Sequence, residues 1–231
     1  MINVGLTLPS FVEDPEIAIT VARAAEDAHL DGVFVYDHVW RGDPPNRRPA
    51  LECFALLGAV VAETTKIKVG TLVARATLRP PAVLAHTFTT ADRISGGRVI
   101  AGIGAGDTQS RAENEAFGLG FGTMVDRINA LHEAVRATQG NGVPVWVGGR
   151  AAQVREIAAI ADGWNGWGAD PQSFAAQVAL DSDDRFRSEE ASRAVEMTLK
   201  LDALITRSCQ PAPRDRGLGR DLAHERGLGG E

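Results

Sequence analysis

The sequence predicts an α/β fold in which a parallel β-sheet is covered by helices. Short runs rich in β-branched residues alternate with longer stretches whose apolar residues recur at helical spacing, and this alternation repeats along most of the chain. Strands that recur every roughly 30 to 35 residues suit both an eight-fold α/β barrel and an open, doubly wound sheet. The spacing alone does not separate these two architectures.

The first strand and helix are bounded by recognisable residues. The apolar run Ile2–Leu8 stops at a proline, and the segment Asp14–Glu16 then supplies an N-cap, a first-turn proline and a first-turn acid. We expect the helix that follows to bury one face, made of Ile17, Val21, Ala24, Ala25 and Ala28.

The later elements follow the same alternation. Two prolines at 80–81 begin a helix that two glycines at 96–97 should end. The other predicted strands are 32–36, 67–73, 99–103, 145–147, 163–167 and 197–206, and the other predicted helices are 50–64, 123–138, 151–161 and 171–180.

The composition indicates a globular protein. Of its 231 residues 44% are hydrophobic, and the net charge of -6 argues against nucleic acid as a partner. The longest apolar stretch, near 53–62, is shorter than the roughly 18 to 20 residues of a membrane span. No basic leader precedes the first strand, so we expect a cytoplasmic protein without a membrane partner. Cys53 and Cys209 are far apart and no Cys/His cluster exists, so neither a disulfide nor a metal site is expected.

Polar residues follow several predicted strands directly. Asp37 and His38 follow 32–36, and Asp107 follows 99–103. In a parallel α/β fold the carboxyl ends of the strands share one edge, which we call the strand-end rim, so these side chains should converge there. Asp37 could instead cap a loop or pair with an arginine such as Arg41, and His38 could be a hydrogen-bonded, partly buried ring. Together, the positions favour a functional site.

Two glycine-rich segments reach the same rim. GIGAGD at 102–107 is not a dinucleotide fingerprint, because Asp107 stands where that pattern needs a glycine. Gly104, Ala105 and Gly106 could form a turn or let the backbone approach a flat ligand. Gly148, Gly149 and Arg150 precede a helix, where backbone amides and the arginine could bind a phosphate or simply make a tight turn.

Four segments resemble the bacterial luciferase-like superfamily of flavin- and deazaflavin-dependent oxidoreductases. They are GVFVYDHVW, IKVGTLVARATLRPPAVLAHTFTTADRISGGRVIAGIGAGD, PVWVGGR and IADGWN, in that order, and the resemblance runs from about Ile2 to Thr206. It implies a TIM-type (β/α)8 barrel with the flavin or deazaflavin ring across the strand ends.

The resemblance also implies roles for individual residues. Asp37 and His38 would flank the ring, with His38 as a base or hydride-transfer partner, and Asp107 would be an acid or a substrate contact. The Leu72–Val73 bond matches the place of a non-prolyl cis peptide that backs the ring. Gly148 and Gly149 match the phosphate loop.

The cofactor implied by the resemblance is the deazaflavin coenzyme F-420 (F420), with FMN as the alternative. With F420 the reaction would be hydride exchange with a small organic substrate; with FMN it would be monooxygenation by reduced flavin and oxygen. A separate reductase would supply the reduced cofactor. Five arginines in the loops after the second and third strands would attract the polyanionic F420 tail; they are Arg41, Arg47, Arg48, Arg75 and Arg79.

The C-terminal part departs from the family pattern. We expect a barrel domain over 1–206 that lacks its last unit, followed by a disordered tail rich in Arg, Gly and Pro over 207–231. An incomplete barrel leaves a second alternative, a family member that binds flavin without catalysis. The helix at 50–64 carries apolar residues around most of its circumference, which predicts a homodimer packed through this region.

Overall fold

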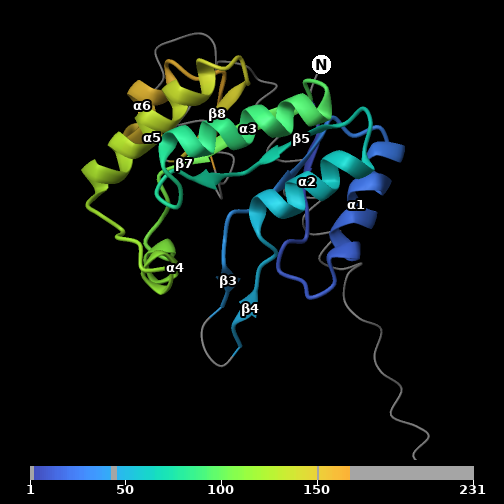
Figure 1. Cartoon of the computed structure of the whole chain (residues 1–231), viewed down its shortest axis with the longest axis horizontal. Coiled ribbons are helices and arrows are strands. Elements are labelled where there is room, and N and C mark those ends of the chain that lie inside the picture. Colours follow the sequence, from blue (N-terminus) through green and yellow to red (C-terminus); the bar gives the residue numbers. More distant parts are fainter. Residues whose placement is uncertain (1–2, 43–45, 150, 167–231) are drawn as a thin grey trace, which may run out of the picture.

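The computed structural model describes residues 3–42, 46–149 and 151–166, which form a curved parallel sheet with helices along one face (Figure 1). In chain order the elements are β1 (Gly5–Thr7), α1 (Pro15–Asp27), β2 (Gly32–Val35), β3 (Trp40–Arg41), β4 (Arg48–Pro49), α2 (Cys53–Glu63), β5 (Lys68–Thr71), β6 (Ala74–Arg75), α3 (Pro81–Ser95), β7 (Val99–Gly104), α4 (Ser110–Ala116), α5 (Met124–Gln139), β8 (Val145–Gly148), α6 (Ala151–Ala158) and β9 (Gly163–Asn165).

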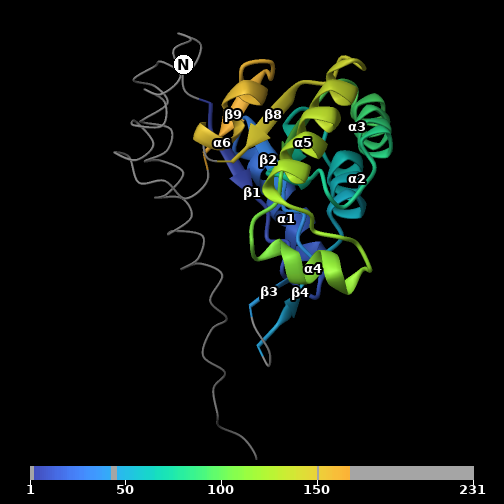
Figure 2. The ribbon, with the colours of Figure 1, turned by 90° about the vertical axis from the view of Figure 1, so that its left-hand side faces the viewer.

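The order of the strands decides between the two architectures. The main path runs β1-β2-β5-β7-β8-β9, every pair along it is parallel, and the strands of this path are arranged in sequence order. A doubly wound sheet reverses direction at a switch point, whereas a barrel keeps adding strands on the same side. The barrel-type prediction is therefore confirmed, and the described strands form an open, curved part of such a barrel (Figure 2).

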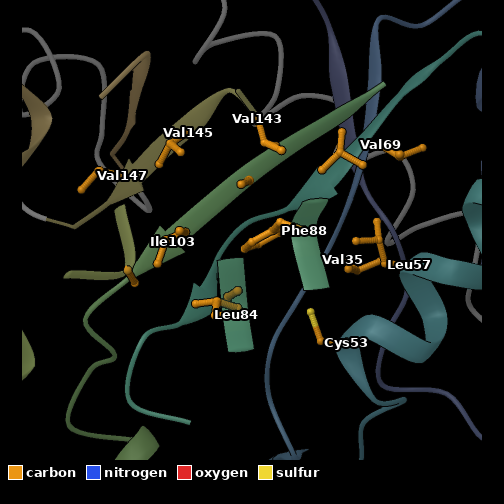
Figure 3. Packing of buried hydrophobic residues seen from close by; sticks show 14 of the residues in the cluster. Val35, Cys53, Leu57, Val69, Leu84, Phe88, Ile103, Val143, Val145 and Val147 are labelled. Atoms are coloured by element: carbon orange, nitrogen blue, oxygen red, sulfur yellow. The ribbon is translucent and has the colours of Figure 1, made fainter. Parts of the chain in front are cut away.

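The two faces of the sheet are packed differently. Valines on β2, β5 and β8, such as Val35, Val69 and Val145, lie in the apolar core that the helices cover (Figure 3). On the other face the ring of Phe34 stacks on that of Trp146 at 5.8 Å between centroids. Glycines on β1, β2 and β5 leave room for Phe34, because added Cβ atoms would lie 2.8 to 3.1 Å from its ring; they are Gly5, Gly32 and Gly70.

Helix α1 begins where the sequence predicts, and its buried face only partly matches the predicted one. Asp14 caps it by accepting a hydrogen bond from the Glu16 amide at 2.9 Å. The buried residues are Ala18, Ala22 and Ala25, whereas Ile17 is 44% exposed. Of the predicted face, Ala25 is buried and Val21 packs against the core, whereas Ala24 and Ala28 are exposed, so the prediction is only partly right. Helix α1 packs against β2 and α2.

Helix α2 is covered on several sides by its own chain. It packs against α1, α3, β2 and β5, which bury Leu57, Val60 and Val61. Phe54 makes an edge-on contact with Phe88 of α3 at 5.2 Å. These apolar residues therefore do not need a second copy of the chain to cover them.

Three features were not predicted: the β3–β4 hairpin, the short β6 and helix α4. Figures 1 and 2 both place the hairpin and α4 on the same side of the sheet. The predicted elements 171–180 and 197–206 and the tail 207–231 lie outside the described residues. Among the residues that are described, no helix is long and apolar enough to cross a membrane.

Candidate functional site

The strand-end rim gathers polar side chains from β2, the segment after β5, and α4. Asp37 and His38 follow β2 after one intervening residue, and Arg75 lies on β6, which pairs with the end of β7. Glu113 lies on α4, the helix that follows β7, and its side chain lies beside Arg75 at the same rim. The convergence expected from a parallel sheet is therefore present, with partners that sequence reasoning did not name.

Asp37 is buried and paired with an arginine. Its Oδ2 accepts hydrogen bonds from the Arg75 amide at 2.8 Å and from Arg79 Nη1 at 2.7 Å, and its Oδ1 lies 3.3 Å from Arg79 Nη2. Arg79 also pairs with Glu52. Burial works against the charge of Arg79, but the two carboxylates hold its pKa above the usual value. Both oxygens of Asp37 are thus engaged in joining β2 to the segment after β5.

Among the described residues, His38 makes hydrogen-bond contacts through one of its two ring nitrogens. Its side chain is 32% exposed, and its Nδ1 lies 3.2 Å from Glu113 Oε1 and 3.3 Å from Oε2. The Phe11 ring lies beside the imidazole, with 6.1 Å between centroids. Within the described part of the chain, Nε2 has no hydrogen-bond partner. His38 therefore combines an anchored ring with a free nitrogen at the rim.

Glu113 is a site residue that sequence reasoning missed. It is buried, and its carboxylate also accepts from the amides of Val39 and Trp40 at 3.1 and 3.3 Å and pairs with Arg75 Nη1 at 2.8 Å. Burial opposes ionisation, but the His38 hydrogen bond and the Arg75 charge hold the pKa of Glu113 below its usual value.

A helical pattern could have revealed Glu113. Ser110, Glu113 and Asn114 are all buried and share one face of α4 at i, i+3, i+4 spacing. Polar residues at this spacing, directly after a segment that ends at the strand-end rim, predict a helix. The polar face of such a helix is expected to point toward the site.

Asp107 accepts hydrogen bonds at the start of α4. It is exposed, and its Oδ1 accepts hydrogen bonds from the amide and the hydroxyl of Ser110 at 2.9 and 2.8 Å. The carboxylate therefore stabilises the first turn of α4 and contacts Ser110 rather than His38.

The peptide bond between Leu72 and Val73 is cis, as the resemblance implies. The Val73 side chain fills the space in front of two rim glycines, because an added Cβ would lie 2.5 Å from it at Gly104 and 2.7 Å from it at Gly148. These two glycines therefore accommodate Val73.

The two residues after β7 differ from each other. Ala105 is buried, and Gly106 has a φ of 75°, so it makes the turn that was one of the two expectations for this segment.

The expected phosphate loop is partly occupied by the protein itself. The Gly149 amide donates to the Asn165 carbonyl at 3.3 Å, and the Gly149 carbonyl accepts from the Trp164 indole at 2.8 Å. The φ of Gly149 is 146°, which favours glycine. Arg150 lies outside the described residues.

The five rim arginines separate into two groups. Arg75 and Arg79 form ion pairs with the buried carboxylates of Glu113 and Asp37, so much of their charge is balanced within the protein. Arg41, Arg47 and Arg48 are exposed on the β3–β4 hairpin. The guanidinium of Arg47 lies 4.2 Å from the centre of the Trp40 ring, and that of Arg41 lies 5.6 Å from the Phe11 ring. The hairpin is the cationic part of the rim.

This chain resembles known proteins by sequence and solved structures by fold. The F420-dependent glucose-6-phosphate dehydrogenase of Amycolatopsis mediterranei is 32% identical over 139 residues, which are 59% of this chain and 40% of that protein. The chain thus spans less than half the length of this relative.

Solved structures show the same fold. An F420-dependent secondary alcohol dehydrogenase in complex with an F420-acetone adduct superposes with a TM-score of 0.66 at 20% identity, covering 79% of this chain and 66% of that one. Riboflavin lyase with modified FMN and riboflavin superposes with a TM-score of 0.65 at 17% identity, covering 78% and 57%.

The family assignment rests on a match along most of the chain. The profile of the luciferase-like monooxygenase family matches residues 3–216, which include every described element of the rim. The chain therefore belongs to the luciferase-like monooxygenase family.

Proposed function

We propose that the chain transfers a hydride between F420 and a small organic substrate. The observation that carries this proposal is that Nε2 of His38 has no hydrogen-bond partner among the described residues, on a ring anchored at the strand-end rim through Nδ1 by Glu113. When bound, F420 accepts or delivers a hydride at its ring carbon. For an alcohol substrate, His38 takes the hydroxyl proton as the hydride leaves, and it returns the proton in the reverse direction.

The charge of the hairpin supports F420 over FMN. F420 continues beyond its phosphodiester into a glutamate tail, whereas FMN ends in a phosphate. Arg41, Arg47 and Arg48 are exposed beside the rim, where they can attract such an anionic tail. The F420-dependent relative supports the same choice.

A titration of both cofactors tests the choice. We expect fluorescence quenching to report tighter binding of F420 than of FMN, and this binding should weaken as salt is raised. Replacing Arg41, Arg47 and Arg48 together with glutamine should remove most of the salt dependence. Arg93→Gln, an exposed arginine at the end of α3, is the matched control. Equal or tighter FMN binding without salt dependence would favour the FMN-dependent monooxygenase instead.

Turnover separates an enzyme from a protein that only binds flavin. Glucose 6-phosphate and simple secondary alcohols, the substrates named for two F420-dependent similar proteins, form the first panel. Reduction of F420 by one of them, lowered about 10²- to 10⁴-fold in His38→Ala, is expected for an acid–base residue. Tight F420 binding without turnover of any substrate would favour the non-catalytic alternative.

The oligomeric state, the cellular compartment and the source of the reduced cofactor are proposed as well. We propose a cytoplasmic homodimer whose reduced cofactor comes from a separate reductase. Since α2 is covered by its own chain, the dimer rests on family resemblance alone. A strictly monomeric mass by light scattering at micromolar concentration would contradict it.

A further inference from the structure

The surroundings of Glu113 dictate its charge state. Its carboxylate is within hydrogen-bond or ion-pair distance of four groups, and three of them can only donate: the amides of Val39 and Trp40 and the guanidinium of Arg75. A protonated carboxyl could donate only to the fourth group, His38 Nδ1, and because imidazole is a stronger base than a carboxylate, a proton shared between them resides on the ring. Glu113 is therefore held as the anion, which has acceptor sites only.

The anion in turn dictates the proton on His38. Nδ1 lies within hydrogen-bond distance of both carboxylate oxygens. Because a carboxylate can only accept, Nδ1 must carry the hydrogen, and in the neutral ring Nε2 then carries the lone pair.

We propose that Glu113 is a positioning residue that holds His38 in the tautomer protonated at Nδ1, so that Nε2 exchanges the proton with the substrate. This inference rests on the proposed hydride transfer. During oxidation of an alcohol, the C–H electron pair leaves as hydride to the deazaflavin and the O–H pair becomes part of the C=O bond. The released proton bonds to Nε2, while Nδ1 keeps its hydrogen and continues to donate it to the Glu113 carboxylate.

Arg75 completes the arrangement. It is buried, and its Nη1 lies 2.8 Å from Glu113 Oε2, on the opposite carboxylate oxygen from the two backbone amides. Its charge compensates that of Glu113, so the carboxylate can orient the imidazole without standing as an unpaired buried charge.

Nitrogen NMR of the protein with isotope-labelled histidine tests the tautomer directly. The measurement needs neither cofactor nor substrate, and His38→Gln identifies the resonances of this ring. We expect neutral His38 to show a protonated Nδ1 and an unprotonated Nε2. A ring protonated at Nε2 would overturn the inference.

Two variants connect the tautomer to catalysis. In Glu113→Gln the amide can either accept from Nδ1 or donate to it, so we expect a mixture of tautomers and a kcat lowered about 10²-fold, with the KM for F420 within about threefold of wild type. Glu115→Gln is the matched control, since this exposed glutamate on α4 undergoes the same change but pairs with Arg111 and does not touch His38. It should keep the tautomer and a kcat within about threefold of wild type.

The outcomes distinguish the inference from the proposed function. Unchanged kcat in Glu113→Gln, or equal losses in both variants, would overturn the positioning role. Failure of F420 to bind wild-type protein would overturn the proposed function, while the NMR spectrum would still decide the tautomer. If Glu113→Gln does not fold, Glu113→Asp keeps the anion and should keep the Nδ1 proton.

Discussion

Asp37 and Arg79, 42 positions apart in the chain, form an ion pair that ties the end of β2 to the start of the segment leading into α3. Two hydrogen bonds join them, at 2.7 and 3.3 Å, and the Asp37 side chain is 5% exposed. A buried pair of this kind contributes mainly through the cost of leaving one charge without its partner.

Asp37→Asn should therefore destabilise the protein strongly. The change leaves the Arg79 guanidinium paired only with the exposed Glu52, and a broken buried pair costs about 3 kcal/mol. Urea unfolding measures the loss. Glu52→Gln is the control, because this exposed partner should contribute below about 1 kcal/mol. Similar losses in both variants would show that Asp37 is not the main partner.

Gly104→Ala should be destabilising because of Val73. The added Cβ would lie 2.5 Å from Val73 Cγ2, and overpacking of this kind costs about 1–3 kcal/mol. Adding Val73→Ala should recover most of the loss, so thermal unfolding of the single and double variants should show strong coupling.

Gly58→Ala is the matched glycine control. Gly58 lies in α2 with no atom within 4 Å of an added Cβ, so the change should stabilise the protein by about 0.5–1 kcal/mol. A loss at Gly58 equal to that at Gly104 would mean that crowding by Val73 is not the cause.

Arg98→Met should weaken the packing between α2, α3 and β5. The buried guanidinium donates to the carbonyls of Val61, Thr64, Ile67 and Ser95 and to the Thr64 hydroxyl, all at 2.8 to 2.9 Å. Its removal leaves these acceptors without their donor, at a cost of about 3 kcal/mol or more. Arg93→Met, at an exposed position of α3, should stay within about 0.5 kcal/mol in the same denaturant assay.

Glu113 should make stability depend on pH in the acid range. Its folded pKa lies below the ordinary value of 4.5, so the unfolded chain takes up the proton first. The stabilisation is complete above pH 4.5 and is lost as the pH falls through the folded pKa. Subtracting the unfolding free energy of Glu113→Gln from that of wild type, measured across this range, should give a difference that is flat above pH 4.5 and shrinks below it. A difference that does not change with pH would contradict the anionic state.

The sequence predicted the ends of helices well where residues at the helix end itself determine them. The Asp14 cap and the first-turn proline begin α1, and the left-handed Gly96 ends α3 as its position after an apolar helix indicated. The direction in which α1 faces is not local. Ala18, Ala22 and Ala25 are buried whereas Ile17 is exposed, and this depends on how α1 packs against β2 and α2.

The same distinction applies to the rim. The alternation of strands and helices was enough to predict parallel strands and to place His38 at a strand end, because helices between consecutive strands leave all their carboxyl ends on one edge. Which charges meet at that edge depends on the folded structure. Arg79 rather than Arg41 pairs with Asp37, and His38 is held by Glu113, which the sequence did not indicate, because these partners lie far apart in the chain and are brought together by the strand order and the packing of α4. Residue types state which charges a site contains, but their pairing depends on distances that the fold creates.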